Sequence, residues 1–170
     1  MGIQIFEDDN QRNEEIREVI ISAFKQKNEA NLVEIIKEKS DFYLSFLAID
    51  DETDKIVGHI MISPMLLNGE KNVLCLVPVS VLAEYENQGI GSLMIKKAIK
   101  EARKKAEEYY ILTVLGSDHY YDRFGFVGYD VKKFTLPFEI EPRFFQIMEL
   151  KEDSLAHLEG KFDYPEYFNV

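Results

Sequence analysis

The chain has 170 residues, 46% of them hydrophobic and 30% charged, which is typical of one soluble globular domain. Asp and Glu outnumber Lys and Arg by 31 to 20, and the net charge of −11 argues against nonspecific nucleic-acid binding, because phosphates would be repelled. The single cysteine excludes an internal disulfide and favours the cytoplasm, and the sequence lacks both a secretion signal and a run of ~20 apolar residues that would cross a membrane.

Residues 1–6 predict an edge strand or an ordered arm, and two amphipathic helices are predicted after them. The acidic and amide residues at 8–10 offer a cap for the first helix. Its apolar residues recur at intervals of three and four, at Ile16, Val19, Ile20 and Phe24. The second helix fits residues 29–39, where apolar residues share one face.

A β-hairpin is predicted next, with strands at residues 43–49 and 55–62 and a polar turn between them. Pro64 and the Asn68-Gly69 pair predict a loop.

Residues 73–82, with the sequence VLCLVPVSVL, favour a strand buried on both faces. Pro78 lies inside this run and cannot donate to a sheet ladder. We therefore expect a bulge or a locally unpaired edge at Pro78.

The clearest helix is predicted at residues 89–108. Downstream, the pattern favours strands at 110–115, 126–136 and 144–150, a connector at 137–142, and a short helix that Asp118 caps and Gly125 ends. The aromatic tail predicts an ordered end. This order indicates one mixed α/β or α+β domain.

The junction between the buried strand and the long helix carries the most chemical information. Backbone amides at a helix start have no partner inside the helix, and the helix dipole adds positive character there. Glycines would let the backbone approach an anion closely, so the turn favours a phosphate site. The converging amides are those of Gln88, Gly89, Ile90, Gly91 and Ser92.

Two common phosphate motifs do not match this turn. The dinucleotide fingerprint needs a third glycine where Met94 stands, and a P-loop needs Gly-Lys where the chain has Gly91-Ser92. Instead the segment resembles the Gln/Arg-x-x-Gly-x-Gly/Ala signature of the GNAT acyltransferases, with Glu86 in place of the usual first Gln or Arg.

This resemblance implies that acetyl-CoA binds at the turn as the acyl donor. The pyrophosphate would contact the turn, and the preceding strand would pair with the pantetheine arm. The implied cofactor-binding residues are Val79, Val81, Asn87, Gln88, Gly89, Ile90, Gly91 and Ser92.

A second landmark is YYDRFGF, residues 120–126, which resembles the Tyr-x-x-x-Gly-Phe element of the same family. The match puts Tyr121 at the position of the general acid, where a phenol donates to the departing thiolate. Tyr120 is the fallback, and Phe124 and Phe126 are expected in the core.

The implied mechanism is direct attack of an amine on the thioester. The backbone amide of Val81 or Leu82 is expected to polarise the carbonyl. The base stays open among three candidates, Glu84, Asp118 and His119.

Cys75 lies mid-strand among aliphatic residues, so it is not expected to act as a nucleophile. The spacing of His, Cys and Asp predicts no metal site.

The resemblance covers about residues 43–136, and the later segments look like a poorly characterised branch of small bacterial acetyltransferases. It implies an α+β GNAT fold: a mixed, mostly antiparallel twisted sheet flanked by helices, with an extra C-terminal strand and tail. We expect one domain at 1–170, with a core at 1–136 and an extension at 137–170. The late strand offers a route to a homodimer.

The sequence therefore predicts an N-acetyltransferase acting on a primary amine of a small molecule or peptide. Its acceptor pocket is expected from residues 12–39, 63–71 and 137 onward. A non-catalytic acyl-CoA sensor is the alternative, and a nucleotide-phosphate binder of another class is a remoter one.

Overall fold

The computed structural model describes residues 2–116 and 118–169. Its internal contacts define two compact units. The first holds the residues up to Ile62, Val77–Lys100 and the residues from Tyr167 on; the second holds Ser63–Leu76 and Glu101–Glu166. The two long central strands each contribute to both units, so the units interleave along the chain. The expectation of a single domain with an extension from residue 137 stays a prediction.

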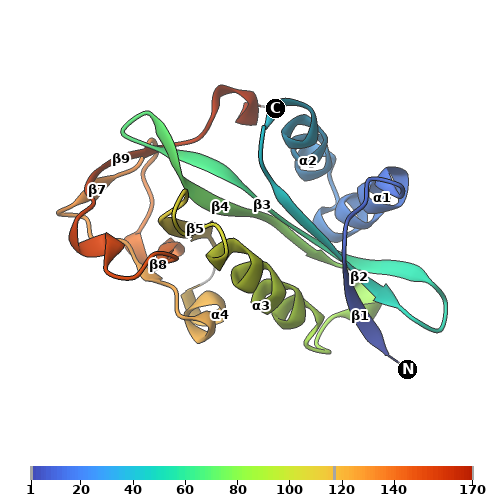
Figure 1. Cartoon of the computed structure of the whole chain (residues 1–170). Coiled ribbons are helices and arrows are strands. Elements are labelled where there is room, and N and C mark those ends of the chain that lie inside the picture. Colours follow the sequence, from blue (N-terminus) through green and yellow to red (C-terminus); the bar gives the residue numbers. More distant parts are fainter. Residues whose placement is uncertain (1, 117, 170) are drawn as a thin grey trace. The chain divides into compact units, whose positions relative to one another are not determined.

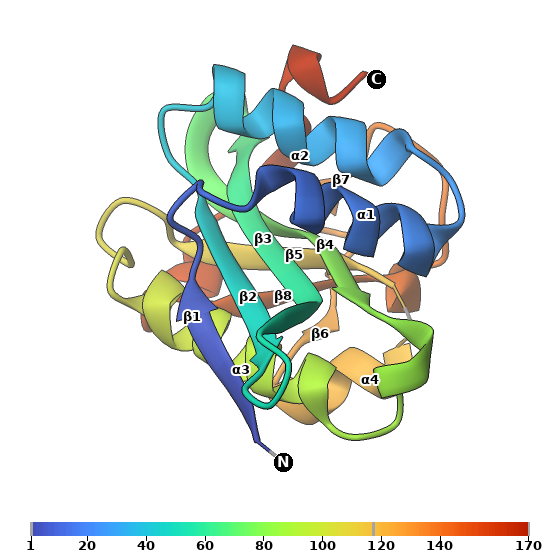
Figure 2. The same ribbon diagram turned by 90° about the vertical axis from the view of Figure 1, so that its right-hand side faces the viewer.

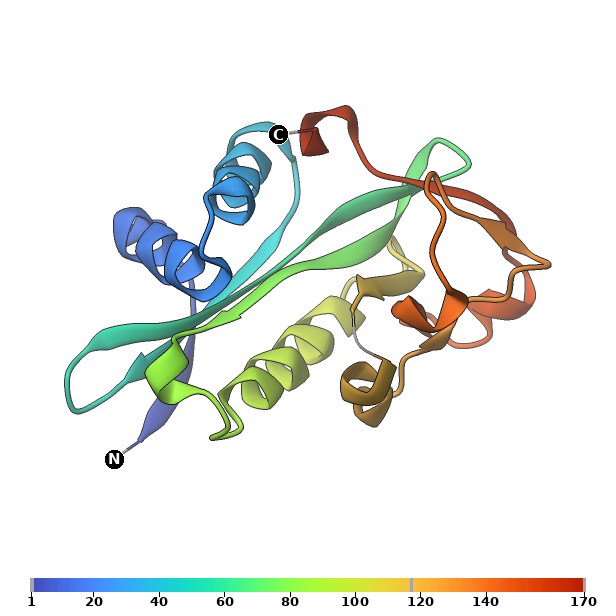
Figure 3. The ribbon, with the colours of Figure 1, turned by 180° about the vertical axis from the view of Figure 1, so that it is seen from behind.

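The first unit is a mostly antiparallel sheet with helices on both faces (Figures 1 and 3). Antiparallel pairs join β1 to β2 and β2 to β3, and β4 follows β3 in the sheet order. Figure 2 shows β1, β2 and β3 side by side beneath the two N-terminal helices. The bounds are β1 Ile3–Glu7, α1 Asn13–Phe24, α2 Asn28–Lys39, β2 Leu44–Asp50, β3 Lys55–Leu67, β4 Glu70–Val81 and α3 Ile90–Arg103.

The N-terminal helices form where the spacing predicted them, because each buries one apolar stripe. The buried residues are Ile16, Val19 and Ile20 of α1 and Ala30, Val33 and Ile36 of α2. The predicted cap is wrong: α1 begins at Asn13, and Arg12 precedes it without a side-chain cap. The carboxylates of Asp8 and Asp9 instead accept the amides of Asn10 and Gln11, closing a turn before the helix.

Helix α3 lies against the opposite face of the sheet from α1 and α2 (Figure 3). Gly58 of β3 allows this close approach. A Cβ atom placed there would lie 2.9 Å from Met94 Cε and 3.0 Å from the Ser80 carbonyl oxygen. A larger residue would force Met94 and the Ser80 carbonyl to shift, so the glycine favours the close packing of α3 on the strands.

The second unit continues β3 and β4 with shorter strands. β5 runs parallel to β4, β8 lies antiparallel to β5, and β6 lies antiparallel to β8. β9 pairs with the end of β3 and with β7. The bounds are β5 Ile111–Leu115, α4 Asp118–Tyr121, β6 Val127–Gly128, β7 Phe134–Thr135, β8 Phe145–Glu149 and β9 Gly160–Asp163. The fold is thus α+β with a mostly antiparallel sheet, as the sequence predicted.

The loop predicted at residues 63–71 is wrong, because most of these residues belong to strands. β3 runs on to Leu67, and Asn68 and Gly69, with φ of 55° and 81°, make a tight hairpin turn into β4. Pro64 is tolerated because its edge of β3 is unpaired at that point. The β2 register ends at Ile62, and the β9 register begins at Leu66.

The strand expected at residues 126–136 is also wrong, since it divides into β6 and β7. Asp130 interrupts it: its carboxylate accepts the Lys132 amide, and its carbonyl accepts the amides of Lys133 and Phe134.

The strand predicted at residues 144–150 is β8, and it is not the last strand, because β9 follows. β8 pairs with β5 along one edge and with β6 along the other. Among the described residues β6 pairs with that second edge only at Gln146 and Ile147, and the dimer expected through this strand stays a prediction.

The aromatic tail is ordered by ring contacts within the second unit. Phe162 stacks on Phe134 with ring centroids 4.9 Å apart, and it lies 5.5 Å from Phe145. Tyr164 stacks on Phe138 at 6.2 Å. Burial of these rings confirms that this part of the tail is fixed to the sheet.

A buried polar chain lies in the first unit. Lys37 forms an ion pair with Asp8, the hydroxyl of Ser45 donates to Asp8 Oδ2 at 2.8 Å, and Ser45 Oγ lies 2.9 Å from His59 Nε2. His59 is fully buried, and desolvation lowers its pKa to about 3 despite the opposing charge of Asp8. His59 therefore stays neutral in the folded protein at ordinary pH.

We predict that His59 makes the stability fall below pH 6.5. In that range the unfolded histidine binds a proton that the folded one does not, down to its folded pKa of about 3. The free energy of unfolding should lose up to ~1.4 kcal/mol per pH unit from this group. Urea unfolding at pH 7.5, 6 and 5 measures the slope. The variant His59→Gln should flatten it, whereas His157→Gln, at an exposed site, should not. An equal slope in His59→Gln contradicts the assignment.

Candidate active site

The end of β4 presents two different faces. Val77, Val79 and Val81 are half-buried on one face, and Pro78 and Ser80 are buried on the other. This alternation is that of an extended strand. The two valines predicted to contact a ligand, Val79 and Val81, therefore share the more accessible face.

The parallel pairing of β4 with β5 is short. It covers Val73 to Cys75, opposite Ile111 to Thr113. The last residues of β5, Val114 and Leu115, pair with β8 on the other side. The locally unpaired edge predicted around Pro78 is consistent with this early end of the β4 register.

One amide at the end of β4 fixes the direction of its neighbours. The N–H of Leu82 donates to the carbonyl of Val57 on β3 at 2.9 Å. Successive amides of a strand point to opposite edges, so the N–H groups of Val81 and Val79 point away from β3. This corrects one expectation: the Leu82 amide is already used, and Val81 is left as the donor for a ligand carbonyl.

The turn after β4 holds the other predicted contact residues. A 3-10 turn, η1 Ala83–Tyr85, follows the strand. Asn87 and Gly89 adopt left-handed backbone with φ of 63° and 80°. Asn87, Gln88 and Gly89 are exposed. A Cβ atom on Gly89 would meet nothing within 4 Å, so the space beside this residue is open to a ligand.

Helix α3 starts directly after this turn. Its hydrogen bonding begins with the N–H of Leu93, which donates to the Gly89 carbonyl at 3.1 Å. The amides of Ile90, Gly91 and Ser92 precede that bond and have no partner within the helix. The first turn carries no acidic residue. The sequence predicted an anion site formed by these three amides and those of Gln88 and Gly89 together with the helix dipole, and that site stays a prediction.

Glu86, the departure from the family signature, lies outside the helix. It ends the 3-10 turn with its amide donating to the Ala83 carbonyl, and its side chain is exposed. Water therefore screens its carboxylate, and an anion bound by backbone amides does not require the usual Gln or Arg.

Tyr121 belongs to the second unit, at the end of α4. Its ring contacts Tyr120 and Phe126 edge-on, with centroids 5.0 and 5.9 Å away. Gly116 makes room for it, since a Cβ atom there would lie 2.6 Å from the ring. Burial, with a smaller effect of Tyr120, raises the pKa of the Tyr121 phenol to about 12. Tyr121 is thus held rigidly and stays protonated.

The neighbouring residues divide as follows. Phe126 is buried, as predicted, and Phe124 is only half-buried. Among the candidate bases, Glu84 and His119 are exposed, and the side chain of Asp118 lies outside the described residues. Gly125 ends the short helical segment with φ of 101°, which confirms its predicted role.

Cys75 is buried, and its thiol donates to the carbonyl of Ser63 at 3.4 Å. Burial raises the pKa of this thiol, which keeps it in the unreactive protonated form. Within residues 2–116 and 118–169, His, Cys, Asp and Glu form no group of three placed to hold a metal. Helices in that same part of the chain are too short or too polar to cross a membrane.

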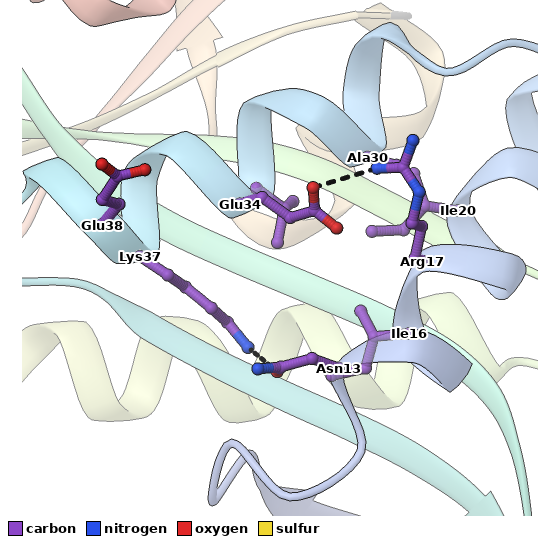
Figure 4. A pocket seen from close by; sticks show the side chains of 9 residues that line it. Asn13, Ile16, Arg17, Ile20, Ala30, Glu34, Lys37 and Glu38 are labelled. Atoms are coloured by element: carbon purple, nitrogen blue, oxygen red, sulfur yellow. Dashed lines mark hydrogen bonds and ion pairs between the residues drawn. The ribbon is translucent and has the colours of Figure 1, made fainter.

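A surface pocket of about 390 Å³ lies between α1 and α2 of the first unit (Figure 4). Two cross-helix bridges border it: Arg17 to Glu34 at 3.1 Å, and Lys37 to Asn13 at 2.8 Å. Buried isoleucines of α1, among them Ile16, form part of its lining. The pocket falls within residues 12–39, one of the segments expected to build an acceptor pocket.

The family model described as the acetyltransferase (GNAT) family matches residues 5–126, most of the chain. The protein therefore belongs to the GNAT acetyltransferase family. It is 31% identical over 115 residues to an uncharacterized N-acetyltransferase, YjhQ, of Escherichia coli. That match covers 66% of this chain and 62% of the relative, so the chain spans less than two thirds of the relative's length.

Solved structures of the same family resemble the whole chain. The GNAT family N-acetyltransferase YhbS of Escherichia coli, in complex with CoA, superimposes with a TM-score of 0.89 at 25% identity. That match covers 99% of this chain and 92% of the other. A GNAT family acetyltransferase of Brucella melitensis, in complex with acetyl-CoA, gives a TM-score of 0.77 at 28% identity and covers 99% of both chains.

We predict that a carboxylate introduced into the first turn of α3 weakens the binding of pyrophosphate to the amides of that turn. In Ser92→Glu a carboxylate sits at the helix start, where it stabilises the helix by ~0.3–1 kcal/mol but repels a bound anion. Inorganic pyrophosphate should shift the amide resonances of residues 90–92 in the wild type and in Ser92→Gln, the uncharged match. In Ser92→Glu those shifts should vanish without loss of thermal stability. Equal shifts in both variants would remove the anion site from this turn.

Proposed function

We propose that the protein transfers an acetyl group from acetyl-CoA to a primary amine of a small molecule or peptide, by direct attack on the thioester. The observation that carries this proposal is the junction after β4. There, outward-pointing strand amides are followed by the unpaired amides of the first turn of α3. Family membership and the two structures with CoA and acetyl-CoA support the same donor.

The donor would be held almost wholly by backbone groups of β4 and α3. The pyrophosphate takes the amides of Ile90, Gly91 and Ser92, and the pantetheine arm takes the edge of β4 at Val79 and Val81. Asn87, Gln88 and Gly89 line the exposed approach to that turn. Backbone donors are fixed by the fold, so little reorganisation accompanies binding.

The Val81 amide would polarise the thioester carbonyl. As the amine attacks, negative charge grows on the carbonyl oxygen, and a fixed N–H donor stabilises that charge by about 3–4 kcal/mol. The Leu82 amide does not share this role, because it donates to Val57.

Tyr121 would stabilise the leaving thiolate of coenzyme A. With its pKa raised to about 12, the phenol is a weaker acid than an ordinary tyrosine and than a thiol of pKa about 8.5. Full proton transfer from this phenol to the thiolate is therefore uphill. Its role is a hydrogen bond donated to sulfur as the C–S bond breaks, with the proton then shared or supplied through water.

The attacking amine must lose a proton, and Glu84 or His119 would accept it through water. Both are exposed, which leaves them accessible to solvent-borne protons. The chain carries a net charge of −11, and this favours the approach of cationic amines over anionic acceptors.

A direct assay tests the proposal. Purified protein is mixed with acetyl-CoA and a panel of polyamines, amino acids, aminoglycosides and peptides, and release of free thiol is followed. Turnover on a member of the panel supports an acetyltransferase. Tight coenzyme A binding without turnover on any amine favours the alternative, a non-catalytic acyl-CoA sensor. Absence of coenzyme A binding overturns both.

Tyr121→Phe should lower kcat by about 10²-fold while leaving the affinity for coenzyme A unchanged, because the lost hydroxyl acts on the leaving group. Since the pKa of Tyr121 lies near 12, the wild-type rate should show no fall around pH 10 that the variant lacks. Tyr120→Phe is the comparison. A loss of kcat there, and not in Tyr121→Phe, would move the role to Tyr120.

A further inference from the structure

The segment that joins β4 to α3, residues 83–89, is exposed along most of its length. Just before this segment, the N–H of Leu82 donates to the Val57 carbonyl of β3. Local backbone bonds follow, from Tyr85 to the Leu82 carbonyl and from Glu86 to the Ala83 carbonyl. Every residue of 83–89 is exposed except Tyr85, which is half-buried. Tyr85 is thus the place where this turn meets the rest of the unit.

Tyr85 reaches across to the end of β2. Its hydroxyl donates to Asp50 Oδ2 at 2.8 Å. Within residues 83–89, all of which the structure describes, the other side-chain hydrogen bond is local, from Gln88 to the Glu84 carbonyl at 3.5 Å. The phenol of Tyr85 therefore supplies the side-chain hydrogen bond between the turn and another element.

Asp50 is a firm anchor for that bond. It is 3% exposed, pairs in register with Ile3 of β1 and Lys55 of β3, and its Oδ1 accepts the amide of Glu52 at 3.0 Å. Its carbonyl also accepts the Asp54 amide at 2.8 Å. A buried carboxylate with both oxygens in use is costly to leave unpaired, so the Tyr85 bond is strongly favoured.

From these contacts we infer that Asp50 and Tyr85 are positioning residues for the donor site: their hydrogen bond sets where the turn presents the first amides of α3 to the pyrophosphate. This inference rests on the proposed function. The sequence analysis did not identify either residue, because Asp50 and Tyr85 lie 35 positions apart and no local pattern distinguishes them.

The reason is geometric. Backbone amides bind an anion well only when several point at the same spot, and a displacement of about 1 Å weakens all of them together. Asn87 and Gly89 have left-handed backbone, and they place the turn between Tyr85 and Ile90. Releasing Tyr85 frees the turn and with it the first amides of α3, whereas the body of the helix stays packed through buried Met94 and Ile95.

The test compares two acetyl donors that differ in the pyrophosphate. Acetyl-CoA carries it, and S-acetylpantetheine lacks it. In Tyr85→Phe, kcat/KM for acetyl-CoA should fall about tenfold, the scale of one hydrogen bond to a charged group, mainly through KM. The value for S-acetylpantetheine should hold within about twofold. A change in general stability would lower both donors alike, so the difference isolates the turn.

Asp50→Asn is the second variant. An asparagine can keep its oxygen for the Glu52 amide and turn its NH₂ group toward the Tyr85 hydroxyl, which replaces a charge-assisted hydrogen bond by a weaker neutral one. It should give a smaller donor-selective loss than Tyr85→Phe, and the double variant should lose no more than Tyr85→Phe alone, because both changes act on one bond. Tyr43→Phe is the matched control. Tyr43 directly precedes β2, and its hydroxyl accepts a 3.3 Å hydrogen bond from Asn10. In this variant the ratio of kcat/KM for acetyl-CoA to kcat/KM for S-acetylpantetheine should stay that of the wild type.

The outcomes separate the two proposals. If coenzyme A binds the wild type and Tyr85→Phe equally tightly, the inference about Asp50 and Tyr85 is overturned and the proposed function stands. If coenzyme A does not bind the wild type in isothermal titration, both fall.

Discussion

The geometry of the candidate site depends on the peptide groups that the end of β4 and the start of α3 cannot satisfy internally. A strand shared between two neighbours uses both edges, and a helix uses every amide but its first few. Here the β4 register with β5 ends at Cys75, and the hydrogen bonds of α3 begin only at Leu93. The chain therefore exposes donors at a strand edge and at a helix start only a few residues apart. Unpaired N–H groups of this kind are tolerated in the folded protein because water or a ligand can accept their hydrogen bonds.

The surrounding residues of the first unit fix this junction in place. Gly58 leaves room for Met94 of α3 and for the Ser80 carbonyl, and the N–H of Leu82 fastens the end of β4 to the Val57 carbonyl. On the other face, buried polar groups from Lys37 to His59 connect α2, the segment after β1, and strands β2 and β3. A buried ion pair of this sort adds little net stability but penalises alternative packings, since each would strand a charge. This network therefore favours one register of β2 with β3, the strand to which the Leu82 amide fastens the end of β4.

Local pattern was enough for the elements that bury a regular face. The apolar spacing located α1, α2 and α3, although α3 ends at Arg103 and not at residue 108 as predicted, and VLCLVPVSVL located β4, because burial and periodicity coincide there. The local pattern failed where pairing with residues far away in the sequence determines the secondary structure. Pro64 looks like a loop signal, yet it lies in a strand whose neighbouring edge is unpaired at that residue. Asp130 broke an apparent strand through three local hydrogen bonds, a turn chemistry that apolar content conceals. In the site, the glycine turn and Tyr121 were recognisable from motifs. The Asp50–Tyr85 bond was not, because no local pattern encodes a contact over 35 residues.

In the proposed site, binding of the anion by backbone amides would account for the unusual Glu86. Where peptide N–H groups bind the anion, the fold supplies the recognition, and the side chain at the usual Gln or Arg position becomes secondary. A carboxylate is then tolerated if water screens it, as the exposure of Glu86 allows. The same logic applies to the leaving group. A phenol whose pKa burial has raised to about 12 is poor at giving up its proton but still donates a hydrogen bond at any ordinary pH. Both features point to a site that works through fixed dipoles more than through titrating side chains, so its activity should depend on how rigidly the turn is held.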